Sequence, residues 1–170
     1  MYFPMILQMK KQLGQVDKWL EAAEAHATTK KFDSKAFLTE RLVVDQFAFA
    51  RQVQVLCDTA RQGIGRLTGR PVDPVADTET TLEALRARVK ATIAFVDGFG
   101  EKDFEGAATR SVTQPRWEGK TMTGNDYFFE HMTPNFFFHL TTAYAILRKN
   151  GVALGKGDYL GALTKHAPKA

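Results

Sequence analysis

The sequence has only one cysteine, Cys57, so an internal disulfide is excluded. Cys57 falls within a helical pattern of apolar residues, and we interpret it as a small core residue. The chain also lacks a run of about 18 apolar residues, the length that a membrane span requires. Its first apolar residues precede its first lysines, which is the reverse of the order in a secretory signal. We therefore expect a cytoplasmic protein that does not bind a membrane.

Charge of one sign is never concentrated along the chain. The 23 Lys and Arg residues alternate with 19 Asp and Glu residues, which leaves a net charge of +4. No basic stripe is interleaved with aromatic residues, so we do not expect a nucleic-acid partner. The sequence also lacks a phosphate-binding loop, a dinucleotide fingerprint, a nucleophile elbow and the paired cysteines of a zinc site.

What the sequence does contain is apolar residues at helical spacing. The first stripe alternates spacings of three and four residues: Ile6, Met9, Leu13, Val16, Leu20, Ala23 and Ala27. Similar stripes predict helices from about Val43 to Leu67, from about Thr80 to Gly98, and from Thr133 to Asn150. We therefore predict an all-α fold in which four long helices form an antiparallel four-helix bundle. The length of 170 residues fits a single domain spanning residues 1–170.

The predicted helix ends rest on capping residues. Gly69 ends the second helix, as a C-terminal glycine does. Thr80 and Glu83 have the spacing of a capping box at the start of the third helix. Thr133 suits an N-cap, and Pro134 suits the first position of the fourth helix.

Two segments lack a helical pattern. Residues 101–132 form a long predicted loop before the last helix, and such loops are often functional. Within it, residues 110–117 alternate loosely and predict a short strand or hairpin arm. The glycine-rich tail from Val152 is predicted to be a loop, either free or folded back onto the bundle.

The candidate functional residues centre on His139. Asn135 lies one helical turn earlier on the same face. We predict that His139 points into the bundle and lies near Asp45 or Gln52 of the second helix. The ring is then either part of a ligand pocket or a buried histidine satisfied by one hydrogen bond. Asp45 has a second interpretation, as a carboxylate that favours the first turn of its helix.

Two further residues complete the predicted pocket lining, His131 and Tyr144. Pro134 separates His131 from His139, so His131 is predicted to precede the last helix. The remaining histidines are assigned to the end of the first helix, for His26, and to the tail, for His166.

The C-terminal third of the chain resembles a bacterial family of unknown function within the DinB/YfiT-like superfamily of metalloenzymes. The resemblance extends over nearly the whole chain, and its most specific segments are Pro134-Asn135-Phe136-Phe137-Phe138-His139, Thr142-Ala143-Tyr144-Ala145-Ile146-Leu147-Arg148, Gly155-Lys156 and Asp158-Tyr159-Leu160. It implies a four-helix bundle of up-down-down-up type that is often dimeric, so we expect a homodimer.

The resemblance also implies a divalent metal, zinc or nickel, held by three histidines. One histidine comes from the second helix, and two come from the last helix, four residues apart. In this chain Asn135 and His139 stand at the latter two positions, and the second helix has no histidine. His139 and Asp45 are therefore the candidate metal ligands, and Asp45 or Gln52 would substitute for the missing histidine of the second helix. Carboxamides are weak ligands for zinc and nickel, so the ligand set is incomplete.

Two functional hypotheses follow. Some members of the superfamily are thiol-dependent transferases or isomerases, which implies a small-molecule enzyme, or a remnant of one, with a degenerate metal site between the second and fourth helices. The alternative is a non-catalytic bundle that binds a small ligand or another protein.

Overall fold

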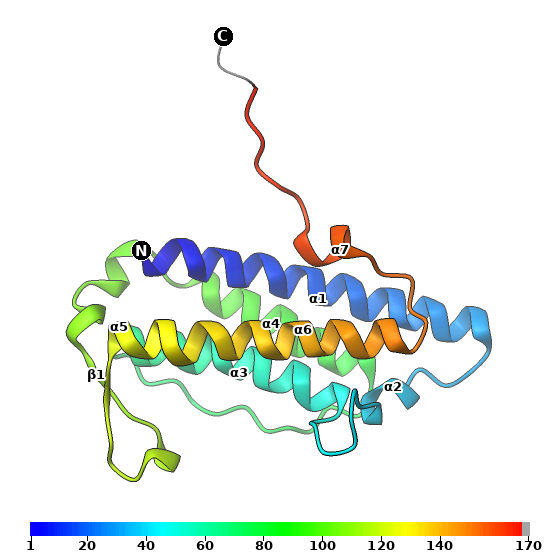
Figure 1. The fold of residues 1–170 in the computed structure, drawn as a ribbon, viewed down its shortest axis with the longest axis horizontal. Helices are drawn as coiled ribbons and strands as arrows, with labels where there is room; N and C mark the ends of the chain where they lie inside the picture. Colours follow the sequence, from blue (N-terminus) through cyan, green and yellow to red (C-terminus); the bar gives the residue numbers. More distant parts are fainter. Residues whose placement is uncertain (168–170) are drawn as a thin grey trace.

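The structure, a computed structural model, describes residues 1–167 and is mostly helical. Its long helices are α1 (Tyr2–Lys30), α3 (Phe49–Thr68), α4 (Leu82–Asp97) and α6 (Thr133–Lys149). They lie side by side, with α1 and α6 running in one direction and α3 and α4 in the other (Figure 1). Helix α1 packs on α4 and α6, and α3 packs on the same two helices. The predicted domain extends to residue 170, and residues 168–170 lie outside the described part.

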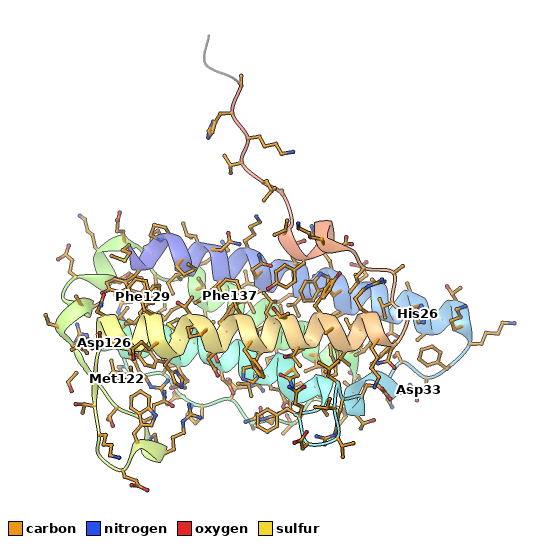
Figure 2. The ribbon with its side chains drawn as sticks, viewed as in Figure 1. His26, Asp33, Met122, Asp126, Phe129 and Phe137 are labelled. Atoms are coloured by element: carbon orange, nitrogen blue, oxygen red, sulfur yellow. The ribbon has the colours of Figure 1, made fainter. Side chains whose placement is uncertain are left out.

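The apolar stripes form the core between these helices. Every residue of the stripe predicted for the first helix is buried, and so is Trp19. Phe137 on α6 packs against the same core (Figure 2). Cys57 is completely buried, and burial raises the pKa of its thiol to about 12, which is consistent with a core residue and not with a nucleophile.

The second long helix begins at Phe49, and the predicted start at Val43 is wrong. Residues 40–48 instead form an irregular loop after the short helix α2 (Ala36–Thr39). The backbone N–H of Phe49 donates to the carbonyl of Glu40 at 2.8 Å, which closes this loop. Val44 is 93% exposed, so its apolar side chain does not continue the core stripe.

Helix α4 starts close to the predicted position, but its cap is Thr81 rather than Thr80. The Thr81 side chain accepts a hydrogen bond from the backbone of Ala84 at 3.0 Å. Leu82 is buried immediately after it, so the cap falls one residue later than the capping-box spacing indicates. At the end of α3, Gly69 has a φ of 74°, the left-handed conformation expected of a C-terminal glycine.

The segment before α6 contains short elements. Two 3₁₀ turns, η1 (Glu101–Phe104) and η2 (Ala107–Thr109), lead into strand β1 (Ser111–Val112). Strand β1 pairs with the antiparallel strand β2 (Met122–Thr123), which confirms a hairpin arm in the predicted region. A further turn, η3 (Pro115–Trp117), lies between the strands. We call residues 111–123 the hairpin.

The last helical segment begins nine residues before the position predicted from Thr133. Helix α5 (Gly124–Asp126), capped by Thr123, continues through a π-helical turn, η4 (Tyr127–Met132), into α6. Thr133 has helical dihedral angles, so it is not an N-cap. A proline inside a helix lacks its N–H and crowds the carbonyl four residues earlier. The wider π turn directly precedes Pro134, and it accommodates the proline within a continuous helix.

The tail folds back onto α1 as far as its short helix, one of the two alternatives predicted, and the described residues after that helix extend away from the long helices (Figure 1). It includes a short helix, α7 (Lys156–Leu160), which the loop prediction missed. The indole N–H of Trp19 donates to the carbonyl of Asp158 at 3.1 Å, and the ring of Tyr159 stacks on that of Trp19. Within residues 1–167, no helix combines the length and the apolar character needed to cross a membrane.

Candidate functional site

A polar cavity of about 180 Å³ lies between α3, the π turn, the start of α6 and the hairpin. We call it the α3–α6 pocket. Thr59, Gln62 and Arg66 line it from one face of α3, because spacings of three and four residues place side chains on the same side of a helix. The remaining lining residues are Arg51, Val55, Asp58, Gln114, Arg116, Tyr127, His131 and Asn135.

His131 is held by an arginine from the hairpin. Nη2 of Arg116 lies 2.6 Å from Nε2 of His131. An arginine can only donate, so Nε2 accepts this hydrogen bond and the neutral ring carries its proton on Nδ1. Burial lowers the pKa of His131, and the charges of Arg116 and Arg66 lower it further, which favours the neutral ring. Nδ1 is buried and has no hydrogen-bond partner within residues 1–167.

Tyr127 forms the aromatic wall of the pocket. Its ring stacks on that of His131 with centroids 5.4 Å apart, and Trp117 packs edge-on against His131. Arg66 donates to the Tyr127 hydroxyl at 3.3 Å. Burial raises the pKa of Tyr127, so the hydroxyl keeps its proton at neutral pH. The Arg116 guanidinium and the Tyr127 hydroxyl, which both lie next to His131, can therefore donate hydrogen bonds.

Farther along the same helical segment, Asn135 joins α6 to α3. Its amide Nδ2 donates to the hydroxyl of Thr59 at 2.8 Å. That hydroxyl in turn donates to the carbonyl of Val55 at 2.7 Å. The amide nitrogen of Gln114, brought in by the hairpin, is buried and has no partner within the described chain.

Some of the charged side chains that line the pocket form ion pairs, and others do not. The carboxylate of Asp58 accepts from Arg88 at 2.7 Å, and Arg51 forms an ion pair with Asp77. Arg66 and Arg116, in contrast, form no ion pair with a carboxylate within residues 1–167. The uncompensated charge at the pocket is therefore positive, and the unpartnered nitrogen atoms of His131 and Gln114 add further donors.

His139 lies in the interior between α6 and α3, as predicted, and its partner is Gln52. Nδ1 of His139 lies 2.7 Å from Oε1 of Gln52. The amide nitrogen of Gln52 donates to the carbonyl of Phe47 at 2.9 Å, so Oε1 is free to accept from the imidazole. Burial, with a smaller effect of Arg51, lowers the pKa of His139 to about 4. This pair does not line the α3–α6 pocket.

Two of the predicted site residues lie elsewhere. Asp45 belongs to the exposed loop of residues 40–48, so it is not the first-turn carboxylate of α3. Tyr144 packs edge-on against the rings of Trp19 and Tyr159, on the side of α6 that faces α1 and α7. It follows Asn135 by nine residues, which at 3.6 residues per turn is two and a half turns and reverses the face. Asn135 and His131 do line the pocket.

The donor atoms do not fit the metal that the superfamily resemblance implies. No three His, Cys, Asp or Glu side chains within residues 1–167 are grouped so that they could hold a metal ion. Near His139, the available atoms are neutral oxygens of Gln52, Asn135 and Thr59, and Gln52 Oε1 already accepts from the imidazole. Zinc and nickel prefer imidazole and anionic ligands.

Sequence reasoning missed the pocket arginines. Arg66 follows Thr59 by seven residues, so a search for polar residues at helical spacing along α3 would have detected it. Arg116 and Gln114 carried no such signal, because only the docking of the hairpin brings them to the helices.

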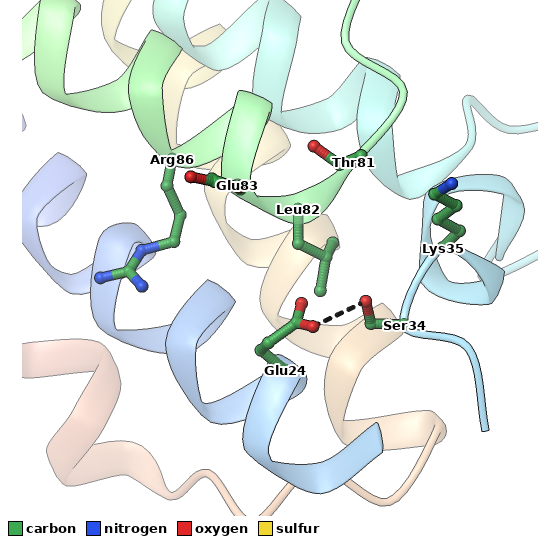
Figure 3. Close-up of a pocket in the computed structure, with 7 residues that line it drawn as sticks. All are labelled: Glu24, Ser34, Lys35, Thr81, Leu82, Glu83 and Arg86. Carbon is green, nitrogen blue, oxygen red and sulfur yellow. Dashed lines mark hydrogen bonds between the residues drawn. The ribbon is translucent and has the colours of Figure 1, made fainter. Parts of the chain in front are cut away.

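A larger cavity, of about 450 Å³, lies between α1 and the start of α4 (Figure 3). Its charged lining residues are two acids, Glu24 and Glu83, and two bases, Lys35 and Arg86, so the two signs balance. Ser34 donates to Glu24 at 3.0 Å, and Arg86 donates to Asp17 at 2.9 Å. This balance is typical of a solvated surface network, so we do not place the functional site there.

Comparisons with known proteins agree with this architecture. The model of a family described as a domain of unknown function (DUF1993) matches residues 1–160. Among solved structures, a DinB family member protein from Shewanella denitrificans is 47% identical and superposes with a TM-score of 0.90. That match covers 96% of this chain and 93% of the other. The comparison with curated proteins found no match.

Proposed function

Because the chain belongs to the DUF1993 family and has a DinB-like fold, neither of which specifies an activity, we propose a function from the α3–α6 pocket. The protein binds a small molecule that carries an anionic, oxygen-rich group. The observation that carries this proposal is the convergence of Arg66 and Arg116, neither of which has a carboxylate partner in the described chain, on one cavity.

The lining of the pocket is complementary to such a group. Arginine presents several N–H donors in a planar fork that matches the oxygens of a carboxylate or phosphate. The Nδ1–H of His131 and the amide nitrogen of Gln114 are buried donors without acceptors. An unpaired buried donor costs about 1–3 kcal/mol, which a ligand oxygen would recover. A bound oxyanion would therefore neutralise the arginines and satisfy both donors.

The scaffold suits this role. We propose that the long helices act as a four-helix bundle of up-down-down-up type, in which ligand sites form between facing helices. Binding at this pocket requires no metal, because its charged side chains are arginines and an engaged aspartate. We also propose that the protein is cytoplasmic.

An enzymatic role is a second candidate, and His131 is the observation that favours it. The ring is neutral and has one fixed tautomer, which suits a general base once Arg116 turns to the ligand and frees Nε2. A thiol-dependent transferase or isomerase would use this base to take the proton of a low-molecular-weight thiol such as glutathione, while the charges of Arg66 and Arg116 would stabilise the thiolate that forms. The ultraviolet absorbance of the thiolate in a glutathione titration tests this. It should appear in the native protein and be lost in His131→Gln.

Calorimetric titration with sulfate tests the binding proposal. Arg66→Gln and Arg116→Gln should each weaken sulfate binding by about tenfold or more, since a hydrogen bond to a charged group contributes about 1.5–3 kcal/mol. Arg61→Gln is the matched control, because it removes the same charge from the same helix but lines a different cavity. Equal sulfate affinity in all three variants and the native protein would contradict the proposal.

We also propose that the chain forms a homodimer, as the resemblance implies. The structure has an exposed apolar surface that could be covered by a second copy, formed by Leu42, Val43, Val44, Phe47 and Phe138. Light scattering at micromolar concentration should give the dimer mass. Val44→Asp, at the most exposed of these positions, should shift the protein toward monomer. A native protein that is already monomeric would overturn this proposal.

A further inference from the structure

The α3–α6 pocket adjoins a second cavity along α3, because Gln62 and Arg66 line both. From this arrangement we infer that the ligand is an amphiphilic organic anion, with an oxyanion head in the α3–α6 pocket and a short apolar body in the second cavity. This inference rests on the proposed function, because the head occupies the same arginines.

The second cavity has a volume of about 340 Å³ and lies over the last turns of α3. It shares Gln62 and Arg66 with the α3–α6 pocket, so the two cavities adjoin along the same helix face. Its other lining residues are Gly65, Gly69, Arg70, Pro71 and Val72. We call it the Val72 cavity.

Size favours a ligand that occupies both cavities. Pockets for organic ligands generally have volumes of about 300–1,000 Å³. The α3–α6 pocket, at about 180 Å³, is below this range and accommodates an anionic head group alone. Together with the Val72 cavity it falls within the range. An inorganic anion held by Arg66 and Arg116 would leave the Val72 cavity unfilled.

The chemistry changes between the two cavities. Gly65, Gly69, Pro71 and Val72 offer no charged side chain. Arg70 is paired with Asp103 and lies over the ring of Phe99 at 5.0 Å, so its charge is already engaged.

The amide of Gln62 donates to the carbonyl of Val72 at 3.0 Å, so one of its two N–H groups is occupied. The apolar stems of Arg66 and Arg70 add to the lining. The Val72 cavity therefore suits a short hydrocarbon body.

Val72 forms a fixed wall of this cavity. A Cβ atom placed on Gly65 would lie 2.5 Å from Cγ2 of Val72, so the valine already sits directly against the helix backbone. A larger side chain at position 72 cannot move toward α3, so we expect it to extend into the cavity that Val72 lines. Val72→Phe is therefore a means of filling the space proposed for the ligand body while leaving Arg66 and Arg116 in place.

The experiment compares linear carboxylates of increasing length, from acetate through butyrate to hexanoate, by calorimetric titration at one pH and ionic strength. Burying a CH₂ group contributes about 0.8 kcal/mol, so affinity should rise by about twofold to fourfold for each CH₂ until the cavity is filled. Val72→Phe should abolish this rise and leave the affinities for acetate and sulfate unchanged. Val75→Phe, at an exposed valine of the same segment, is the matched control and should retain the rise.

The outcomes separate this inference from the proposed function. If neither sulfate nor any carboxylate binds, the proposed function fails, and the inference fails with it. If sulfate and acetate bind through Arg66 and Arg116 but affinity is independent of chain length, only the inference is overturned. The same conclusion follows if Val72→Phe retains the full rise with length. Val72→Leu, a smaller change, replaces Val72→Phe if circular dichroism shows that the phenylalanine variant is unfolded, and it should reduce the rise.

Discussion

The imidazole of His139 donates from Nδ1 to Oε1 of Gln52 across 2.7 Å, which joins α6 to α3 inside the core. His139 is only 6% exposed. Phe47 contacts both members of the pair. Its backbone carbonyl accepts a hydrogen bond from the amide of Gln52, and its ring stacks on the imidazole of His139. The contact holds a neutral histidine between the two helices that form the candidate site.

This pair predicts a pH-dependent stability. The pKa of His139 is about 4 in the folded protein, against an ordinary value of 6.5, so the unfolded chain binds a proton first as pH falls. Its contribution to the free energy of unfolding is complete above pH 6.5 and is lost as pH falls toward 4. The loss is on the order of 3 kcal/mol. Urea unfolding at a series of pH values measures it.

Two histidine variants provide the comparison for that measurement. His139→Gln should flatten the pH dependence between these limits, and His131, whose pKa is also lowered, should account for the part that remains. His166→Gln, in the exposed tail, is the control substitution. An unchanged slope in His139→Gln would show that His139 does not supply this proton linkage.

Sulfate binding is predicted to strengthen as pH falls. Burial, Arg116 and Arg66 lower the pKa of His131 in the free protein. A bound anion counters both arginines and favours the charged ring, so the complex has the higher pKa and takes up protons. Of the other charged groups lining the pocket, Arg51 is paired with Asp77 and Asp58 with Arg88.

Calorimetry in two buffers of different ionisation enthalpy counts the protons taken up on sulfate binding. Sulfate itself does not titrate in the neutral range, so the count reports on the protein. His131→Gln should bind sulfate with little pH dependence. Proton uptake that persists in this variant would assign the linkage to another group.

Gly63 is predicted to be intolerant of alanine, although alanine is the better helix former by about 1 kcal/mol. A Cβ atom at Gly63 would lie 2.5 Å from the sulfur of Met132, which is completely buried in the π turn. Overpacking of this kind costs about 1–3 kcal/mol, so Gly63→Ala should lower the free energy of unfolding. In a double-mutant cycle, Met132→Ala should relieve part of the cost, and additive effects would refute the clash.

Metal analysis tests the ligand set directly. Protein expressed with added zinc or nickel and then dialysed should contain less than one metal ion per chain. His139→Ala should leave that content unchanged while lowering stability by about 1–3 kcal/mol, because Gln52 loses its buried partner. Stoichiometric metal that disappears in His139→Ala would restore the metalloenzyme hypothesis.

Local periodicity was sufficient to determine much of this protein from its sequence. The core stripe of α1, the glycine at the end of α3 and the inward orientation of His139 all follow from spacing along one helix. The interaction between Asn135 and α3 follows from the same reasoning, since four residues separate it from His139. These features depend on contacts that each helix makes through one face, and the spacing of the residues along the sequence identifies that face.

Tertiary packing alone decided the rest. The sequence around Pro134 is typical of a helix start, but the structure has a π turn before it and a continuous helix through it. Met132 of the π turn packs against Gly63 of α3. Asp45 looks like a helical residue, but the loop before Phe49 leaves it exposed, because the neighbouring valines do not reach the core.

The candidate site itself depends most on long-range packing. Arg116 meets His131 only because the hairpin folds against the π turn, and Arg66 reaches the same cavity from a different helix. A spacing rule within one element does not report on which charges from separate elements come together or which of them lack a partner. The positive charge of the α3–α6 pocket is therefore a property of the folded chain and not of any local segment.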